Sequence, residues 1–122
     1  MCTDDSAPGP GPGKPEVPYD AFAALDLRTA TVVAARRHPQ ADKLLLLDVD
    51  LGALGRRQIV AGIARHYEAE PLVGRSIIVV ANLRPVRLRG EESRGMLLAA
   101  SAGESVVLLT TLEPLPPGSP VS

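Results

Sequence analysis

The chain has 122 residues, close to the commonest size of one domain, so we expect one hydrophobic core with flexible ends. Apolar residues make up 45% of it but aromatic residues only 2%, which predicts an aliphatic core. The single cysteine, Cys2, excludes an internal disulfide. No apolar run approaches the ~20 residues of a membrane-spanning helix, and the N-terminus lacks the layout of a signal peptide, so we expect a cytoplasmic protein without membrane contact.

The charges are unevenly distributed along the chain, whose formal net charge is −1. Most charged residues before residue 21 are acidic, so the remainder carries a slight basic excess. Within that remainder Arg84, Arg87, Arg89 and Arg94 follow one another closely. Because binding to a phosphate backbone needs local positive charge, this cluster keeps nucleic acid among the candidate partners. The alternative interpretation of the cluster is a solvated charged loop.

Residues 1–18 alternate proline with glycine and contain few hydrophobes, which predicts a disordered tail. In residues 19–25, Phe22 and Leu25 lie three positions apart, as in one or two turns of amphipathic helix. We expect this helical turn to plug or flank the core.

After this turn the hydrophobic period changes to two, the spacing of β-strands. Strands are predicted at residues 27–33, 44–51, 58–61, 77–81, 96–100 and 106–109. In the second of them one face is apolar and consists of Leu45, Leu47, Val49 and Leu51. The fourth is apolar throughout, so it should be buried on both sides. A short helix is expected around residues 63–72, ended by Gly74.

Five or six strands, with one helix between the third and fourth and no βαβ repeat, predict an all-β fold, a five-stranded OB-fold barrel. We assign residues 1–18 to the tail, 19–101 to the OB-fold domain and 102–122 to a C-terminal extension. The extension is apolar in its first half and rich in proline and glycine in its second. We therefore expect it to form the interface of a homodimer, packing against a partner subunit rather than completing its own barrel.

Residues suited to catalysis are scarce. The two histidines, His38 and His66, and the tail cysteine show no convergent arrangement, and no cysteine and histidine cluster has zinc-ligand spacing. Asp48 and Asp50 share one face of a predicted strand, which indicates a solvated edge more simply than an acid and base pair. The sequence predicts neither an enzyme nor a cofactor or metal site.

The polar loop between the fourth and fifth strands, residues 82–96, is the most informative segment. In OB folds this loop and the face of strands two and three form the usual oligonucleotide site. Arginine binds phosphate through a planar fork, and Asn82 and Ser93 offer groups that can meet a 2′-hydroxyl or a base edge. Lys43, at the start of the second strand, would add a phosphate contact from the neighbouring loop.

Aromatic residues decide between two modes of RNA binding. A generic single-strand binder stacks bases on several aromatic side chains, but only Tyr19, Phe22 and Tyr67 exist here. We interpret Phe22 and Tyr67 as packing residues. What remains is recognition of a folded RNA by its shape and backbone.

Five motifs, in this order, resemble the tRNA-binding domain family. They are FAALDLR at 22–28, HPQADKL at 38–44, RQIVAGI at 57–63, VVANLRP at 79–85 and LRGEESRGMLLA at 88–99. The resemblance covers residues 19–118. This family occurs at the C-terminus of many bacterial methionyl-tRNA synthetases, in endothelial monocyte-activating polypeptide II and in free-standing tRNA-binding proteins.

The resemblance implies an OB fold that binds tRNA, either as a free-standing protein or as a detached synthetase subunit without the catalytic domain. It also implies a homodimer joined by the C-terminal segment, with an aminoacyl-tRNA synthetase as a further partner. The positions that match the family's tRNA contacts are Lys43, Asn82, Arg84, Arg87, Ser93 and Met96, with Arg28 and Arg89 as additions.

Two alternatives stay open. One is a dimer resembling the secretion chaperones of the same superfamily, which would hold unfolded polypeptide in an apolar groove. Ala41-Asp42-Lys43 and the run from Leu88 to Met96 speak against it, because chaperone-like relatives typically have a different sequence after the first strand and lack that run. The other is an assembly module that tethers a synthetase to protein partners through the barrel surface.

Overall fold

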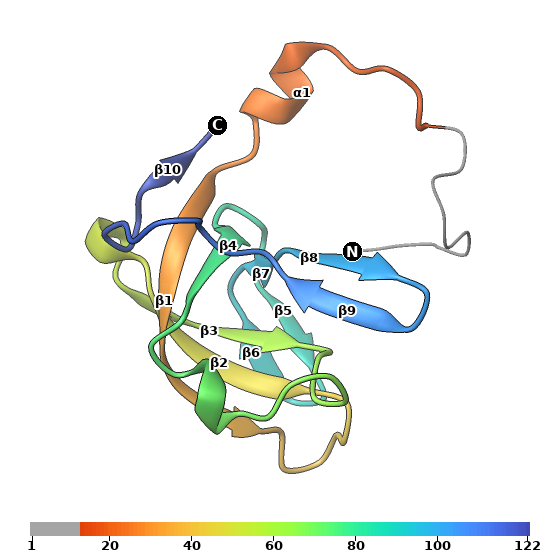
Figure 1. The fold of residues 1–122 in the computed structure, drawn as a ribbon, viewed down its shortest axis with the longest axis vertical. Coiled ribbons are helices and arrows are strands. Elements are labelled where there is room, and N and C mark those ends of the chain that lie inside the picture. Colours follow the sequence, from red (N-terminus) through yellow and green to blue (C-terminus); the bar gives the residue numbers. More distant parts are fainter. Residues whose placement is uncertain (1–12) are drawn as a thin grey trace.

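The longest element of the computed structural model, which describes residues 13–122, is strand β1, Leu27–Arg37 (Figure 1). Its first half pairs with β4, Ser76–Val80, and its second half with β2, Leu45–Asp50. The register of the β1–β2 pair shifts between Val32 and Ala34, which marks a β-bulge. Because a bulge bends a strand and increases its twist, β1 can serve two halves of a sheet that curls on itself.

The sheet runs in the order β3, β2, β1, β4, β7, with every pair antiparallel. Its outer members are β3, Arg56–Ala61, and β7, Met96–Leu97. Between them, the backbone N–H of Arg94 donates to the carbonyl of Gln58 at 2.9 Å, so the barrel is nearly closed. The predicted OB-fold barrel is confirmed.

The core fills the inside of this barrel with aliphatic side chains. The apolar face predicted for the second strand is confirmed, since Leu45, Leu47, Val49 and Leu51 are all at most 1% exposed. Strand β4 is buried on both sides as predicted, from Ile77 to Val80. Tyr67 packs against the core and accepts a hydrogen bond from the N–H of Leu108 at 3.0 Å, which confirms its packing role.

The predicted helix between the third and fourth strands is reduced to one 3-10 turn, η2, Glu70–Leu72. Turns precede it, and a similar 3-10 turn, η1, Gly52–Leu54, joins β2 to β3. Pro71 cannot donate a backbone hydrogen bond, which suits it to the first turn of a helix and prevents a helix from continuing through it. Buried Ile63 and Leu72 anchor this connection to the core.

The N-terminal helix does form, as α1, Tyr19–Ala23, but it does not plug the core. None of its residues is buried, and Figure 1 shows it projecting from one end of the barrel. Phe22 is 40% exposed and lies 6.1 Å from Tyr19 between ring centroids. Phe22 therefore pairs with Tyr19 within α1 and is not a core residue. The tail predicted before α1 lies outside the described residues up to residue 12, and residues 13–18 are exposed and irregular.

The C-terminal segment forms its own strands. A hairpin of β8, Ala99–Ala102, and β9, Ser105–Leu108, crosses the expected boundary at residue 101. The final strand β10, Pro120–Val121, pairs with the start of β1 in the same chain, Val121 lying opposite Leu27. We expected the extension to pack against a partner subunit and not against its own barrel. For these last residues that expectation is wrong, because they pair with β1 of the same chain.

Replacing Leu47 by Ala should lower the free energy of unfolding by about 2–5 kcal/mol, because the side chain is fully buried in the core. Urea titration followed by circular dichroism measures this change. Leu54→Ala is the matched control, since Leu54 is 38% exposed and its loss should cost far less. Equal losses for both variants would contradict the core described here.

Candidate nucleic-acid interface

The polar loop predicted between the fourth and fifth strands contains a hairpin of β5, Val86–Leu88, and β6, Glu91–Ser93. Its turn is Arg89-Gly90, and both residues have positive φ, 54° and 89°. Such a turn suits a two-residue hairpin because its twist matches that of the strands. This hairpin was not predicted from the sequence, where residues 82–96 were expected to form a loop. We refer to residues 82–95 as the arginine loop.

Four arginines of this loop are exposed: Arg84, Arg87, Arg89 and Arg94. The guanidinium of Arg87 donates to the carbonyl of Gly90 at 2.9 Å, which orients it along the hairpin. None of the four forms an ion pair within residues 13–122, where the carboxylate of Glu91 instead accepts a hydrogen bond from Gln58. Each guanidinium carries five N–H donors, so most donors of these arginines remain available to a ligand.

The arginine loop is tied to the neighbouring turn at residues 38–44. A guanidinium nitrogen of Arg89 donates to the carbonyl of Gln40 at 3.3 Å. Exposed Lys43 lies three positions further along this turn, where its carbonyl accepts the N–H of Ala64 at 3.1 Å. The structure thus brings the segments of Lys43 and Arg89 to the same end of the barrel, as the sequence predicted for neighbouring loops.

His38 shapes that turn from inside. Only 6% of it is exposed, and its Nδ1 accepts the backbone N–H of Gln40 at 3.0 Å. Nδ1 is therefore the acceptor in this bond. Within residues 13–122 the buried Nε2 has no hydrogen-bond partner. Buried His38 is a structural element of the turn.

Ser93 has no exposed surface. Its hydroxyl accepts the N–H of Val60 at 3.0 Å and donates to the carbonyl of Gly95 at 3.0 Å. It therefore joins β3 to the end of the arginine loop where no strand pairing does so. Although the sequence places Ser93 among the tRNA contacts, the hydroxyl has no access to a ligand in this conformation. Met96, by contrast, is partly exposed in β7.

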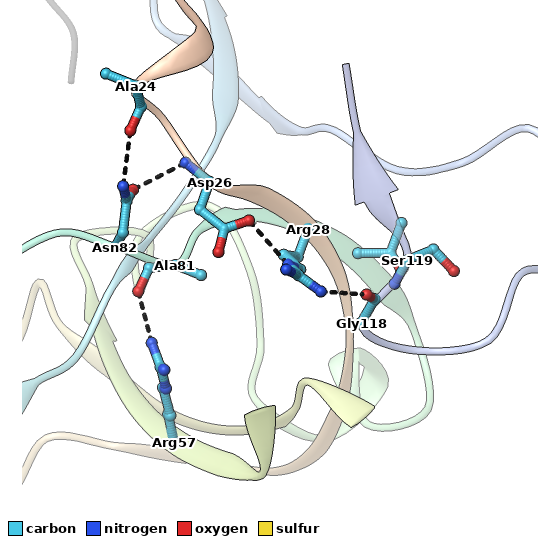
Figure 2. Close-up of polar contacts among 9 residues, drawn as sticks. Ala24, Asp26, Arg28, Arg57, Ala81, Asn82, Gly118 and Ser119 are labelled. Atoms are coloured by element: carbon cyan, nitrogen blue, oxygen red, sulfur yellow. Dashed lines mark hydrogen bonds and ion pairs between the residues drawn. The ribbon is translucent and has the colours of Figure 1, made fainter. Parts of the chain in front are cut away.

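Two further predicted contacts, Asn82 and Arg28, are engaged within the chain (Figure 2). The amide oxygen of Asn82 accepts the N–H of Asp26 at 2.9 Å, and its nitrogen donates to the carbonyl of Ala24 at 2.8 Å. Nε of Arg28 contacts the carboxylate of Asp26 at 2.8 Å, and another guanidinium nitrogen donates to the carbonyl of Gly118 at 3.1 Å. Both side chains hold chain segments together.

A shallow groove of about 270 Å³ crosses the outer face of β1, β2 and β3. Arg56 and Gln58 of β3 and Asp48 of β2 lie on it, and Gln58 also holds the arginine loop through the carbonyl of Glu92 at 2.9 Å. Neither Arg56 nor Gln58 was predicted as a site residue. The two residues lie two positions apart in β3 and share a face. The strand predicted from the sequence, residues 58–61, begins after Arg56, so the sequence carried no signal for this pair.

The same part of the chain, residues 13–122, holds no cluster of three potential metal-ligating side chains. Its helices are all too short to cross a membrane.

Fold and site together define a small OB-fold module whose arginine loop lies beside the strand face that such barrels use for oligonucleotides. The chain belongs to the tRNA-binding domain family, since the family described as "Putative tRNA binding domain" matches residues 27–120.

Proteins of similar sequence and structure are consistent with membership of this family. Methionine–tRNA ligase of Methanothrix thermoacetophila is 55% identical over 105 residues, which cover 86% of this chain but only 15% of the ligase. The structure of a protein from Pyrococcus horikoshii described as related to MetRS matches with a TM-score of 0.83 and 34% identity, covering 89% of this chain and all of that one. The chaperone CsaA of Bacillus anthracis matches with a TM-score of 0.82 and 34% identity, covering 88% of this chain and all of that one.

Replacing Ser93 by Ala should lower the free energy of unfolding by about 1–3 kcal/mol, because the N–H of Val60 is left buried without a partner. Thermal or urea unfolding measures the loss. Ser101→Ala removes an exposed hydroxyl and should have no comparable effect. If Ser93→Ala leaves stability unchanged, the hydroxyl does not secure the loop as described.

Proposed function

We propose that this protein binds folded tRNA through the arginine loop and the adjoining turn at residues 38–44. The observation that carries the proposal is a set of exposed basic side chains on two loops that the hydrogen bond from Arg89 to Gln40 joins. The direct contacts proposed are Lys43, Arg84, Arg87, Arg89 and Met96. Family membership supports tRNA as the ligand.

The chemistry of these side chains favours recognition of shape and backbone over reading of single bases. Guanidinium forks bind phosphate oxygens bidentately, and phosphate contacts fix the position of a protein on its nucleic acid. Tyr67, one of three aromatic residues, packs against the hydrophobic core, which leaves it poorly placed as a stacking platform. A curved surface with few aromatic side chains suits a folded RNA.

We propose further that the protein acts in the cytoplasm without catalytic activity of its own, as a free-standing tRNA-binding protein or as the partner of an aminoacyl-tRNA synthetase. The 55% identity to a part of methionine–tRNA ligase supports the association with a synthetase. In this proposal the chain binds and presents tRNA and catalyses no reaction.

A homodimer joined by the C-terminal segment is part of the proposal. Four large hydrophobic residues of this segment are exposed: Val107 at 56%, Leu109 at 39%, Leu112 at 100% and Leu115 at 52%. These four side chains follow one another closely in the sequence, and apolar surface of this kind marks an interaction site where it gathers on a protein. Two barrels in one dimer would each present an arginine loop to one tRNA, which raises the apparent affinity.

Replacing Arg84 or Arg87 by Ala should weaken tRNA binding and reduce the slope of log affinity against log salt by about one per residue, since each loses a phosphate contact. Filter binding at several salt concentrations measures both quantities. Arg75→Ala, an exposed arginine outside both loops, is the matched control for charge.

Three competitors in the same assay separate the alternative functions: total tRNA, a short single-stranded oligonucleotide and an unfolded model protein. We expect tRNA alone to compete well. Tight capture of the unfolded protein with no tRNA binding would replace this proposal by a chaperone function, which the likeness to CsaA makes the second candidate.

Replacing both Leu112 and Leu115 by Glu should convert the dimer to a monomer, because buried carboxylates oppose association. Light scattering reports the molar mass, and filter binding should then give a weaker tRNA affinity. Val73→Glu, at an exposed hydrophobic residue elsewhere, is the control. An intact protein that is monomeric at micromolar concentration and still binds tRNA tightly would remove the dimer from the proposal.

A further inference from the structure

Asn82, two residues after the end of β4, fixes the base of the arginine loop to the start of β1. Its amide behaves like a short piece of backbone, since it accepts from Asp26 and donates to Ala24. Next to it the backbone N–H of Ala81 donates to the carbonyl of Asp26 at 2.7 Å. The guanidinium of Arg57 donates to the carbonyl of Ala81 on its other side (Figure 2). The position of Asp26 therefore sets where the arginine loop begins.

Asp26 is in turn connected to the C-terminal strand. Its carboxylate holds Nε of Arg28, and the same guanidinium donates to the carbonyl of Gly118 (Figure 2). The side chains of Arg28 and Asp26 are 26% and 36% exposed, so solvent screens their attraction only in part. The guanidinium of Arg28 thus connects the segment before β1 with the segment before β10. This connection depends on the position of the carbonyl of Gly118.

Gly118 stays in place by a close backbone fit. Its N–H donates to the carbonyl of Thr29 at 2.7 Å, and the next N–H, of Ser119, donates to the hydroxyl of Thr29 at 3.0 Å. It has φ of +84°, and a Cβ at this position would collide with the carbonyl of Leu51. No residue other than glycine fits here without displacing the C-terminal strand.

We propose that Asn82, Asp26 and Arg28 form a positioning relay, which couples docking of the C-terminal strand to the conformation of the arginine loop and thereby to tRNA affinity. The proposal rests on the tRNA-binding function above. It gives Asn82 and Arg28 a role that acts through the loop instead of through direct contact with RNA. The relay is a continuous chain of hydrogen bonds between the two sites, and binding at one site must then stabilise the other equally.

Gly118→Ala tests the relay by displacing the strand without removing any charge. We expect tRNA affinity to fall by roughly fivefold or more, the usual size of coupling between two sites. The salt slope should stay unchanged, because no phosphate contact is lost. Gly74→Ala is the matched control, since Gly74 has a similar φ of +90° but open space around its Cβ. Equal affinities for Gly118→Ala and the control would overturn the relay.

Arg28→Lys tests the same relay without touching the strand. Lysine keeps the positive charge but lacks the fork that reaches Asp26 and Gly118 together. A positioning role predicts that Arg28→Lys and Arg28→Ala weaken binding alike, with the wild-type salt slope, and add nothing in the Gly118→Ala background. A direct phosphate contact predicts that Arg28→Lys keeps most of the affinity while Arg28→Ala lowers the salt slope by about one. That second pattern would overturn the proposal.

The hydrogen-exchange rate of a backbone amide tests the relay without tRNA. In Gly118→Ala the amide of Asp26, which donates to Asn82, should exchange at least about tenfold faster than in Gly74→Ala. If the wild-type protein binds no tRNA, the proposed function fails while this exchange rate still decides the coupling. Unchanged protection at Asp26 would overturn the relay even if tRNA binding is strong.

Discussion

The backbone ladder of β1 is the constraint on which the rest of the molecule depends. This strand pairs with β4 and β10 near its start and with β2 beyond its bulge, so its register determines where the neighbouring strands end. The turn that follows β1 carries Lys43, and the segment that follows β4 is the arginine loop. Both loops of the proposed interface are therefore placed by one strand, which is why a short polar hairpin can keep a defined position.

Polar side chains complete the barrel wherever strand pairing stops. Ser93 bonds the backbone of β3, Asn82 bonds the backbone around Asp26, and Gln58 bonds the backbone of Glu92. Each satisfies a main-chain group that would otherwise lie unpaired at a sheet edge. Ser93 and Asn82 belong to the arginine loop itself, so structural side chains alternate there with the arginines of the proposed interface within a few positions.

This alternation of structural and binding side chains limits how much of the site could be predicted from the sequence. The period of two in β2 and the continuous apolar run of β4 depend only on burial, so strands, core and barrel class were predictable. Ser93 and Asn82 were assigned to RNA because a hydroxyl or an amide suits an RNA edge and a main-chain group equally well. Only the packed structure distinguishes these two partners, since the choice depends on residues that lie far away in the chain.

The position of Phe22 and the hairpin of the arginine loop were not predicted correctly, for reasons other than this alternation. Phe22 has the spacing of an amphipathic helix, but spacing indicates that a face is apolar and not what covers it. The hairpin strands β5 and β6 are three residues each, too short for a periodic signal, and their content of arginine and glutamate conceals them. The dipeptide Arg89-Gly90 was the available turn signal, because glycine readily takes positive φ.

The pairing of β10 with the start of β1 has a consequence for the architecture of larger proteins. Val121 lies opposite Leu27, so the chain enters and leaves the barrel at neighbouring points. A domain with adjacent ends can be appended to another chain, or inserted within one, without straining either fold. Because its two ends are adjacent, the barrel can exist as a separate protein or as a small domain of a long polypeptide.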